Sequence, residues 1–457
     1  MSRKPYRQLV LAVILAAGLG AAPAHAQHPA AADRPRAAMT GDNRAADLAA
    51  FRASFMATDK SFSEPARAEA EARLAKLEKE LATASQAYFD LELARIAALA
   101  DNGHTHYVLG SISRYYNRVP IRLGVFGEDF NVLRAQGAND DLLGAKLVSI
   151  DGHPVAELRK AGRSLWGGVE GFRDRFSFNL LESPDLLHAL GLANAHEGAS
   201  YTFETGKGVI QRTLAGEAAS PGRPFSTPAA TFYPAKLALE DASWKTALAS
   251  DKAPWALRDP EKTFRWRAAP DLDAIVIDMR ANVDAADMKV ADAIKMFDAA
   301  IAQERPTNLV LDMRMNGGGN LNTTRAFVKA LPEKIPGRIF VLTSPLTFSA
   351  AISTVGYLEQ AAPDKVTIVG EDVGDRLHFW AEGRGVDLPN NRGMIGLATQ
   401  RHDYAGGCKA YSDCHISVKV SPIAVASLAP DIQAPWTIDA YIAGRDPAID
   451  AVAAALR

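Results

Sequence analysis

A serine at the start of an expected helix is the first candidate for chemistry. Ser349 follows the apolar run RIFVLTS, residues 338–344, and precedes AAISTVGYL, residues 350–358. A serine at this point is commonly a helix cap. The same position would place the hydroxyl at the positive end of a helix, where a developing oxyanion is stabilised. Thr347 and Ala351 replace the glycines of a Gly-x-Ser-x-Gly elbow, so an α/β-hydrolase is disfavoured.

A glycine-rich turn is the second candidate. LDMRMNGGGN, residues 311–320, places three glycines between an expected strand and an expected helix. Glycine lets the backbone approach a ligand closely, and the following helix offers unpaired N–H groups to negative charge. A dinucleotide loop is disfavoured because Asn322 stands where the third glycine would be, and no Gly-x-x-x-x-Gly-Lys-Ser/Thr loop occurs in the chain. A flexible turn without function stays open as the alternative.

The third candidate is a loop with two histidines far upstream. DNGHTHY, residues 101–107, follows a run of strong helix formers and contains His104 and His106. A histidine on such a loop is usually solvated. A serine nucleophile nevertheless needs a base, and the base can come from a distant part of the chain.

Together these features resemble a known family. NLVLDMRMNGGGN, VLTSPLTFSAA and VTIVGEDVGD, in this order and spacing, resemble the catalytic domain of the S41 serine peptidases, the tail-specific or C-terminal processing proteases. DNGHT is similar to the Asp-x-x-His-Thr element of the histidine-using branch, which includes the tricorn core protease and the interphotoreceptor retinoid-binding proteins. LLGAKLVSIDGHPVAEL, residues 142–158, resembles the second half of a PDZ domain. The resemblance covers residues 273–375 and, more loosely, 101–158.

The resemblance implies a ClpP/crotonase-like catalytic fold with Ser349 as nucleophile. It also implies an oxyanion hole made by the N–H groups of Ala350 and Gly318, two donors that would lie at adjacent helix N-termini. The better-known branch of the family activates its serine with a lysine about 25 residues downstream. Here the only lysine close behind the serine is Lys365, and Arg376, which stays protonated, lies in the relevant loop.

The base is therefore expected to be a histidine. His104 fits the family element better than His106, and neutral imidazole suits general-base chemistry near neutral pH. A histidine base is normally held by a carboxylate. Glu371 in VGED is the first choice for that carboxylate and Asp403 in RHDY the second, while a solvated loop acid is an equally open interpretation of Glu371.

The two cysteines of the chain lie close together in GGCKAYSDCHI. In an oxidising compartment Cys408 and Cys414 are expected to form a small disulfide loop. The alternative is two unrelated buried thiols. A zinc site with the nearby His402 and His415 is disfavoured, because the spacing matches no usual ligand pattern. The sequence therefore predicts neither a metal nor a cofactor.

The elements that must position these residues predict a mixed α/β protein. Strands and helices alternate from about Leu272 to Val373, which predicts βαβ units and a largely parallel sheet whose functional residues gather at the carboxyl ends of its strands. The expected divisions are a signal peptide (1–26), a disordered leader (27–60), an N-terminal helical module (61–106), a β-rich segment with the PDZ-like element (107–215), a connecting segment (216–270) and an S41-like catalytic domain (271–457).

The N-terminus and the composition indicate where the protein works. Residues 1–26 carry three basic residues, a short apolar run and a small-x-small end, so cleavage is expected after Ala26, giving a periplasmic or secreted protein with no integral membrane segment. Cleavage would move the formal net charge from −2 to −5, and nothing suggests a nucleic-acid partner.

The function predicted from the sequence is that of a serine endopeptidase. It would form an acyl-enzyme on Ser349, with His104 as base and then acid, and would act on a polypeptide that enters by its C-terminal end if the PDZ-like element is real. The alternatives are a non-catalytic ligand- or peptide-binding protein on the same scaffold, and a serine hydrolase of non-peptide acyl substrates. The sequence does not indicate an oligomeric state.

Overall fold

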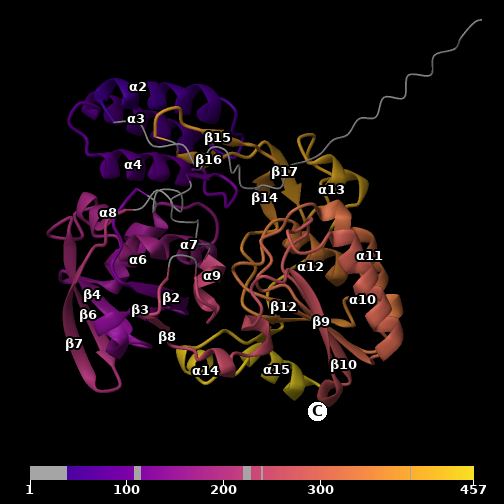
Figure 1. Ribbon diagram of the computed structural model, residues 1–457. Helices are drawn as coiled ribbons and strands as arrows, with labels where there is room; N and C mark the ends of the chain where they lie inside the picture. Colours follow the sequence, from indigo (N-terminus) through magenta and orange to yellow (C-terminus); the bar gives the residue numbers. More distant parts are fainter. Residues whose placement is uncertain (1–38, 108–114, 220–227, 238–239, 392) are drawn as a thin grey trace, which may run out of the picture.

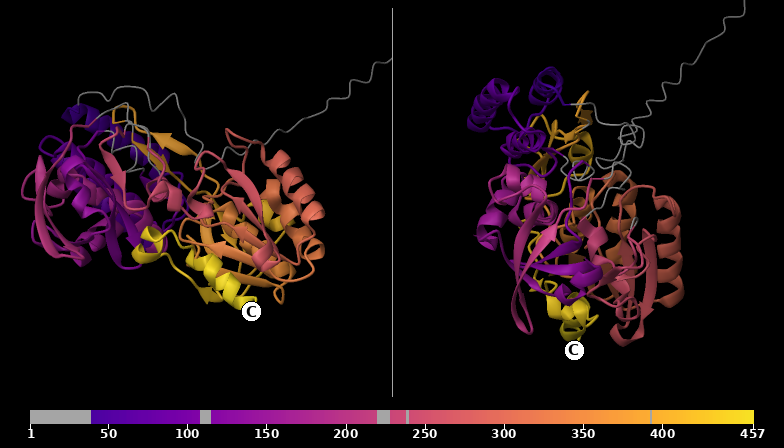
Figure 2. Two further views of the ribbon diagram at one scale, coloured as in Figure 1. Left: turned by 60° about the horizontal axis from the view of Figure 1, so that its bottom comes forward. Right: turned by 60° about the vertical axis from the view of Figure 1, so that its left-hand side comes forward.

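The protein folds around two β-sheets that lie side by side, with a layer of helices above them (Figures 1 and 2). This computed structural model describes residues 39–107, 115–219, 228–237, 240–391 and 393–457. The expected signal peptide, residues 1–26, lies outside the described residues. No helix in the described ranges is long and apolar enough to cross a bilayer.

A six-stranded, mostly parallel sheet forms one half of the molecule, as the alternating pattern predicts. Its strand order is β18 (Ile432–Gln433), β13 (Val366–Gly370), β12 (Ile339–Thr343), β11 (Asn308–Asp312), β10 (Ala274–Met279) and β9 (Phe264–Ala269). Only β9 runs antiparallel to its neighbour. Strands β10 to β13 are buried along their whole length, which accounts for their continuous apolar sequences.

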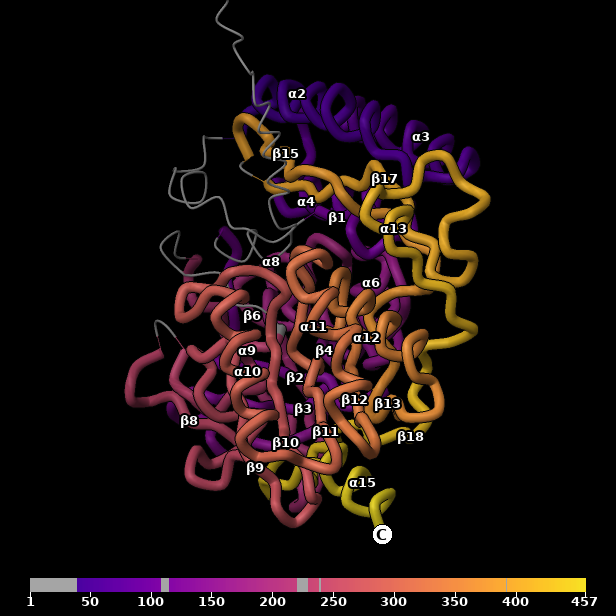
Figure 3. Tube along the Cα trace, turned by 90° about the vertical axis from the view of Figure 1, so that its right-hand side faces the viewer, coloured from indigo at the N-terminus to yellow at the C-terminus, as the bar shows by residue number. Residues whose placement is uncertain are grey.

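Helices cover both faces of this sheet. The helices between successive strands are α10 (Val290–Glu304), α11 (Leu321–Lys334) and α12 (Ala350–Ala361), and Figure 3 views the side on which they lie. Alternate strand residues such as Ile275 and Ile277 belong to the core beneath these helices. The residue between them, Val276, packs on the other face with α15 (Pro447–Ala455). This period of two is the pleat of a strand that is buried on both sides.

The second sheet is antiparallel and forms the other half of the molecule. Its order is β2 (Ile121–Phe126), β3 (Asp129–Gln136), β4 (Lys146–Ile150), β6 (Gly198–Thr205) and β7 (Gly208–Ala215), with β5 (His153–Pro154) on β4 and β8 (Trp244–Thr246) on β3. Asp151 and Gly152 form the expected tight turn, with positive φ at both residues. Three helices lie between β5 and β6 along the chain: α6 (Val155–Arg163), α7 (Glu170–Ser177) and α8 (Pro184–Ala189).

The predicted disordered leader, residues 27–60, needs correction in its second half. Residues 41–50 form α2 (Gly41–Ala50), which continues as a π-helical turn (Phe51–Met56) and precedes the expected helices α3 (Glu64–Glu80) and α4 (Gln86–Ala98). Leu48, Phe51 and Phe55 are fully or almost fully buried. Their spacing of three and four residues places them on one helix face, and an apolar stripe of this kind orders an alanine-rich segment once it packs on a core.

Two expected divisions also differ from the structure. Strand β9, at the edge of the parallel sheet, lies in the expected connecting segment 216–270. From the expected catalytic domain, β15 (Gly385–Asp387) and β16 (Met394–Gly396) reach the N-terminal helices (Figure 1). There β16 pairs with β1 (His106–Tyr107). The histidine-containing loop is thereby tied to a segment almost 300 residues later in the chain.

Candidate functional site

Ser349 lies at a strained turn between β12 and α12. Its backbone has φ 57° and ψ −123°, a conformation that is rare for a residue with a side chain. The side chain makes no capping hydrogen bond to the helix that it precedes. Ser349 therefore does not act as the ordinary serine cap. Backbone strain of this kind persists where the surrounding structure imposes it, which is often at functional sites.

The glycine-rich turn lies directly against the serine. A Cβ atom on Gly318, which has φ 102°, would lie 2.6 Å from Ser349 Cβ and 2.9 Å from Ala350 N. Only glycine fits at this position. The two predicted oxyanion donors are thus adjacent, but the Gly318 N–H already donates to Asn316 Oδ1 at 2.8 Å. The loop itself satisfies this donor in the present conformation.

His104 is buried beside the residue that precedes Ser349. Its ring stacks on Phe348, with ring centroids 4.3 Å apart, and is covered on the other side by Phe379 at 5.5 Å. His104 Nδ1 lies 4.0 Å from Asp375 Oδ2, beyond hydrogen-bonding distance but close enough for an electrostatic interaction. The fold therefore brings His104 to the serine turn from the N-terminal part of the chain.

The Asp375 carboxyl group is buried with His104. Burial raises the pKa of Asp375 to about 7, although the backbone N–H and the guanidinium of Arg376 both act to lower it. Asp375 was not singled out in the sequence. The signal that could have found it is its place as the last residue of VTIVGEDVGD, four positions after Glu371.

Glu371, the first-choice carboxylate, is placed elsewhere. Its carboxylate oxygens accept hydrogen bonds from Arg175 Nη2 at 3.1 and 3.3 Å, which joins the loop after β13 to α7. Arg175 also donates to the backbone oxygen of Val125. Glu371, which was expected to face the histidine, is held instead by a buried arginine, and Asp375 is the carboxylate that lies beside His104.

Asp403 and His106, the second choices for the carboxylate and the base, also interact with other groups. Asp403 forms an ion pair with His378 at 2.8 Å and accepts the backbone N–H groups of Ala405 and Gly406. His106 Nδ1 lies 3.0 Å from the backbone oxygen of Gly103, and its ring lies beside that of Trp166. The structure thus brings together Ser349, Gly318, Ala350 and His104 of the predicted set, and it places Glu371, Asp403 and His106 in other interactions.

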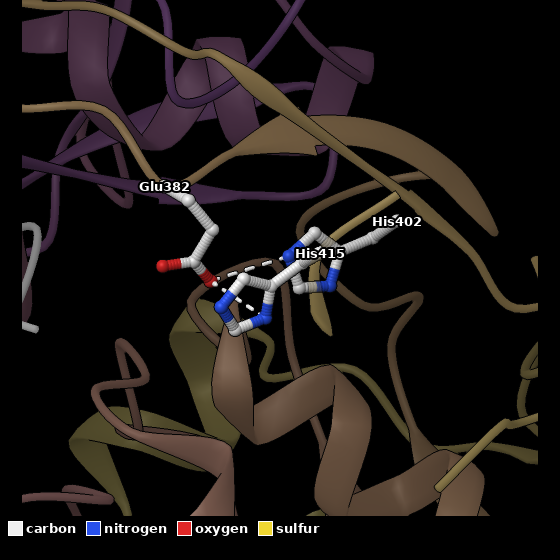
Figure 4. Close-up of side chains that lie close together, drawn as sticks. All are labelled: Glu382, His402 and His415. Atoms are coloured by element: carbon white, nitrogen blue, oxygen red, sulfur yellow. Dashed lines mark hydrogen bonds and ion pairs between the residues drawn. The ribbon is translucent and has the colours of Figure 1, made fainter. Parts of the chain in front are cut away.

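A second cluster of ionisable side chains consists of Glu382, His402 and His415 (Figure 4). The His402 ring stacks on Phe379 with centroids 4.8 Å apart, and the His415 ring stacks on His402 at 5.5 Å. Glu382 Oε1 lies 3.2 Å from His402 Nε2 and 3.7 Å from His415 Nδ1. These three residues are the group of described histidine, cysteine and acidic side chains whose spacing could hold a metal ion.

The protonation states in this cluster have identifiable causes. Burial opposes ionisation of Glu382, but the hydrogen bond and charge of His402 and the charge of His415 outweigh it and lower the pKa of Glu382. Burial lowers the pKa of His415, an effect that exceeds the opposing field of Glu382. The cluster therefore favours an ionised carboxylate beside a neutral imidazole.

The expected disulfide is present next to this cluster. Cys408 and Cys414 are bonded to one another, with their Cα atoms 6.0 Å apart. The prediction of a small closed loop is confirmed, and His415 follows the second cysteine directly.

Comparison with known proteins places the fold. No protein-family model matches the chain, and no curated protein matches it in sequence. Among solved structures, mature CPAF complexed with lactacystin matches with a TM-score of 0.54 and 13% identity, covering 91% of this chain and 98% of that one. A CPAF mutant matches with a TM-score of 0.56 and 12% identity, over 91% and 97% of the two chains. The fold is therefore similar to that of CPAF.

A weaker match names a processing protease. The photosystem II D1 C-terminal processing protease matches over 89% of this chain and 98% of that one, at 15% identity and a TM-score of 0.35, too low to add to the assignment of the fold. The CPAF matches therefore support the overall fold alone. The mixed α/β architecture with a mostly parallel sheet agrees with the sequence prediction.

Proposed function

We propose that the protein is a serine peptidase that forms an acyl-enzyme on Ser349. The observation that carries the proposal is the strained turn at Ser349. The Ser349 hydroxyl does not cap its helix, and the turn lies against the Gly318 loop. The likeness of the fold to CPAF supports a peptidase. In this proposal the catalytic domain has a ClpP/crotonase-like fold and uses histidine as its base.

His104 is proposed as the general base and Asp375 as the carboxylate that holds it. His104 would take the proton from the Ser349 hydroxyl as the oxygen attacks a carbonyl carbon, and would then give that proton to the leaving amine. Ionised Asp375 would stabilise the imidazolium between these two steps. His104 Nδ1 and Asp375 Oδ2 are 4.0 Å apart, so a small rotation of either side chain would bring them within hydrogen-bonding distance.

The oxyanion hole is proposed to consist of the Ala350 and Gly318 N–H groups. Ala350 is the first residue of α12, where N–H groups point outward from the helix end. The Gly318 N–H would exchange its bond to Asn316 for the developing oxyanion. Asn316 can keep its place during this exchange, because its Nδ2 donates separately to the backbone oxygen of Met279 at 2.8 Å.

The proposed substrate is a polypeptide held in part by its C-terminal end. Support comes from the strand, turn and helix formed by β4, Asp151-Gly152 and α6, at the position of the PDZ-like element. A pocket beside α6 is lined by four basic and two acidic side chains, and because Arg159, Arg163 and Arg173 already pair with Asp174 or Asp101, Lys160 is the proposed contact for a terminal carboxylate. Its charged lining residues are Glu128, Arg159, Lys160, Arg163, Glu170 and Arg173.

Binding of the C-terminal end is tested with peptides of identical sequence that carry a free or an amidated C-terminus. The proposal expects the free form to bind the Ser349→Ala protein more tightly, as measured by fluorescence anisotropy. Equal binding of both forms would contradict C-terminal recognition and leave the acyl-enzyme proposal standing.

The catalytic proposal is tested with a fluorophosphonate probe on the purified protein. The wild type should be labelled, and Ser349→Ala should not be. His104→Ala should be labelled at least about 100-fold more slowly, because the serine loses its base. Ser427→Ala, which alters an exposed serine, is the matched control and should behave as the wild type. Labelling that persists in Ser349→Ala would overturn the assignment.

One observation favours a second candidate, a binding protein on the same scaffold. The Gly318 N–H is occupied by Asn316, as a site that performs no chemistry would allow. The same experiment separates the two candidates: an unlabelled wild type that still binds peptide would favour the binding protein.

The place of action is proposed from the N-terminal sequence. Residues 1–26 have the charge and apolar pattern of a signal peptide, so the peptidase would act in the periplasm or outside the cell. The mass of the protein recovered from the exported fraction should correspond to a chain that begins at Gln27.

A further inference from the structure

The chain has a second site at which side chains from three separate segments converge. We propose that Glu382, His402 and His415 bind one divalent transition-metal ion, with zinc as the expected ion. The proposal does not depend on peptidase activity, since none of these residues belongs to the proposed acyl-enzyme machinery.

The donor atoms already have the spacing of a metal site. Glu382 Oε1 is 3.2 Å from His402 Nε2 and 3.7 Å from His415 Nδ1, and one ligand atom from each residue lies within 4.8 Å of the others. Zinc bonds of 2.0 to 2.2 Å in a tetrahedron place neighbouring donors about 3.3 Å apart. If His415 Nδ1 moved slightly closer to Glu382 Oε1, the three donor atoms would occupy three corners of the tetrahedron.

The fold holds the three ligand residues close together without a bound ion. Glu382 follows β14 (His378–Ala381), and His402 lies on β17 (Gln400–Asp403), which pairs with β14. His415 follows Cys414 of the disulfide, and its N–H donates to the backbone oxygen of Arg401 at 3.0 Å. Strand pairing, a disulfide and a backbone hydrogen bond thus hold the three side chains together, which lowers the entropy lost on binding.

A second set of contacts orients His402. Its Nδ1 lies 2.9 Å from Tyr404 Oη, which is 2.6 Å from Ser353 Oγ on α12. Metal-binding histidines usually use their other ring nitrogen in a hydrogen bond of this kind, which fixes the ring and its tautomer. With Nδ1 engaged by Tyr404, the Nε2 atom is directed at Glu382, as Figure 4 shows.

His415 provides the observation that points most directly to a ligand. Its Nδ1 atom is buried and has no hydrogen-bond partner among the described residues. A buried polar atom left in this way costs free energy. Because this atom faces the Glu382 carboxylate at 3.7 Å, an ion between them would use both the nitrogen lone pair and the negative charge.

The donor set selects the kind of ion. Two imidazole nitrogens and one carboxylate oxygen suit zinc and its transition-metal neighbours, whereas magnesium and calcium prefer oxygen ligands. Three protein ligands leave a fourth position for water. The sequence alone disfavours a zinc site with His402 and His415, because the three ligands lie on different elements and their spacing follows no zinc motif.

The test is zinc binding by the full chain, with any affinity tag removed, the disulfide kept oxidised and metals removed with EDTA and dialysis. Calorimetric titration with zinc chloride should give one ion per chain. His415→Gln and Glu382→Gln should each weaken binding at least about tenfold. His153→Gln is the matched control, because His153 is a half-buried histidine paired with the single carboxylate of Glu157, and it should leave binding unchanged.

A measurement on the unaltered protein guards against variants that fail to fold. Cobalt(II) added to the metal-free wild type should give the intense visible absorption of a four-coordinate ion, and one equivalent of zinc should remove it. Failure of the wild type to bind a stoichiometric ion would overturn the proposal. Undiminished binding by both folded variants, His415→Gln and Glu382→Gln, would overturn it as well.

Discussion

At the scale of single residues, the most consequential group is the buried Asp375 carboxyl. Its pKa of about 7 follows chiefly from burial, and only its ionised form can stabilise a positive charge on His104. The rate of fluorophosphonate labelling should therefore rise as the pH passes through about 7.

This pH dependence is measured as the second-order labelling rate between about pH 5 and pH 9. Asp375→Asn should slow labelling by at least about 100-fold at pH 8, because the imidazolium loses its counter-charge. Asp372→Asn, an exposed acid on the same loop, should keep the profile of the wild type. A wild-type profile that is flat across neutral pH would contradict the role of Asp375.

The same residue gives a prediction about stability with a definite sign. The pKa of Asp375 is raised from 3.8 in the unfolded chain to about 7 in the folded protein. Between these values the folded protein binds more protons than the unfolded chain, so the free energy of unfolding falls as the pH rises. Asp375→Asn removes the ionisation and should raise the free energy of unfolding at pH 8, by on the order of a few kcal/mol.

Thermal melts at about pH 4 and pH 8 measure this difference. The melting temperature of Asp375→Asn should exceed that of the wild type at pH 8, and the gap should shrink towards pH 4. Asp372→Asn is again the matched control. A gap of the same size at both values would show that burial of the ionised Asp375 is not its cause.

Gly318 gives a prediction with an internal control one position away. A Cβ at Gly318 would meet Ser349 Cβ at 2.6 Å, whereas a Cβ at Gly317 would meet nothing within 4 Å. Gly318→Ala should therefore displace the serine turn and lower the labelling rate by about 100-fold or more. Gly317→Ala should stay within about twofold of the wild type. A fully active Gly318→Ala protein would contradict the close approach of the two loops.

At the scale of elements, a buried carboxylate in α2 accepts hydrogen bonds from a distant segment of the chain. Asp47 accepts the backbone N–H groups of Asn390 and Asn391, each at 2.8 Å. Burial raises the pKa of Asp47, although these hydrogen bonds act to lower it. The contact links the first described helix to the segment between β15 and β16.

Asp47→Ala should therefore destabilise the protein. Two buried backbone donors would lose their acceptor, and the expected loss is about 2 to 4 kcal/mol in the free energy of unfolding. Asp42→Ala changes an exposed acid in the same helix and should cost less than about 1 kcal/mol. Urea denaturation of the two variants measures the difference. Equal losses would show that the Asn390 and Asn391 contacts contribute little.

The elements also show what the sequence could reveal. The βαβ order was predictable because β10 to β13 are continuous apolar runs separated by strong helix formers. The helix α2 was not predictable, because its few large apolar residues find the core on which they pack only in the folded molecule. Ser349 and the glycine loop stood out by type and position. Asp375 did not, because the conformation of its loop decides which of two nearby acids faces His104 and which faces Arg175.

At the scale of the whole molecule, the site joins distant parts of the chain. Ser349 comes from the parallel sheet, while His104 comes from the loop that follows the N-terminal helices. One apolar core extends from Leu48 to Leu428 and includes residues of both sheets. The N-terminal helices are therefore part of the structure that places the proposed base, and the two sheets share a continuous interior.

The pairing of β1 with β16 has a consequence for synthesis of the chain. His106 pairs with Gly396, so the loop that carries His104 acquires its partner strand only after the ribosome has added residue 396. Ser349 and Gly318 are made earlier and can fold with the parallel sheet, since domains tend to form as they emerge. A nascent chain therefore carries the proposed nucleophile without a fixed base. Completion of the proposed site is therefore delayed until nearly the whole polypeptide exists.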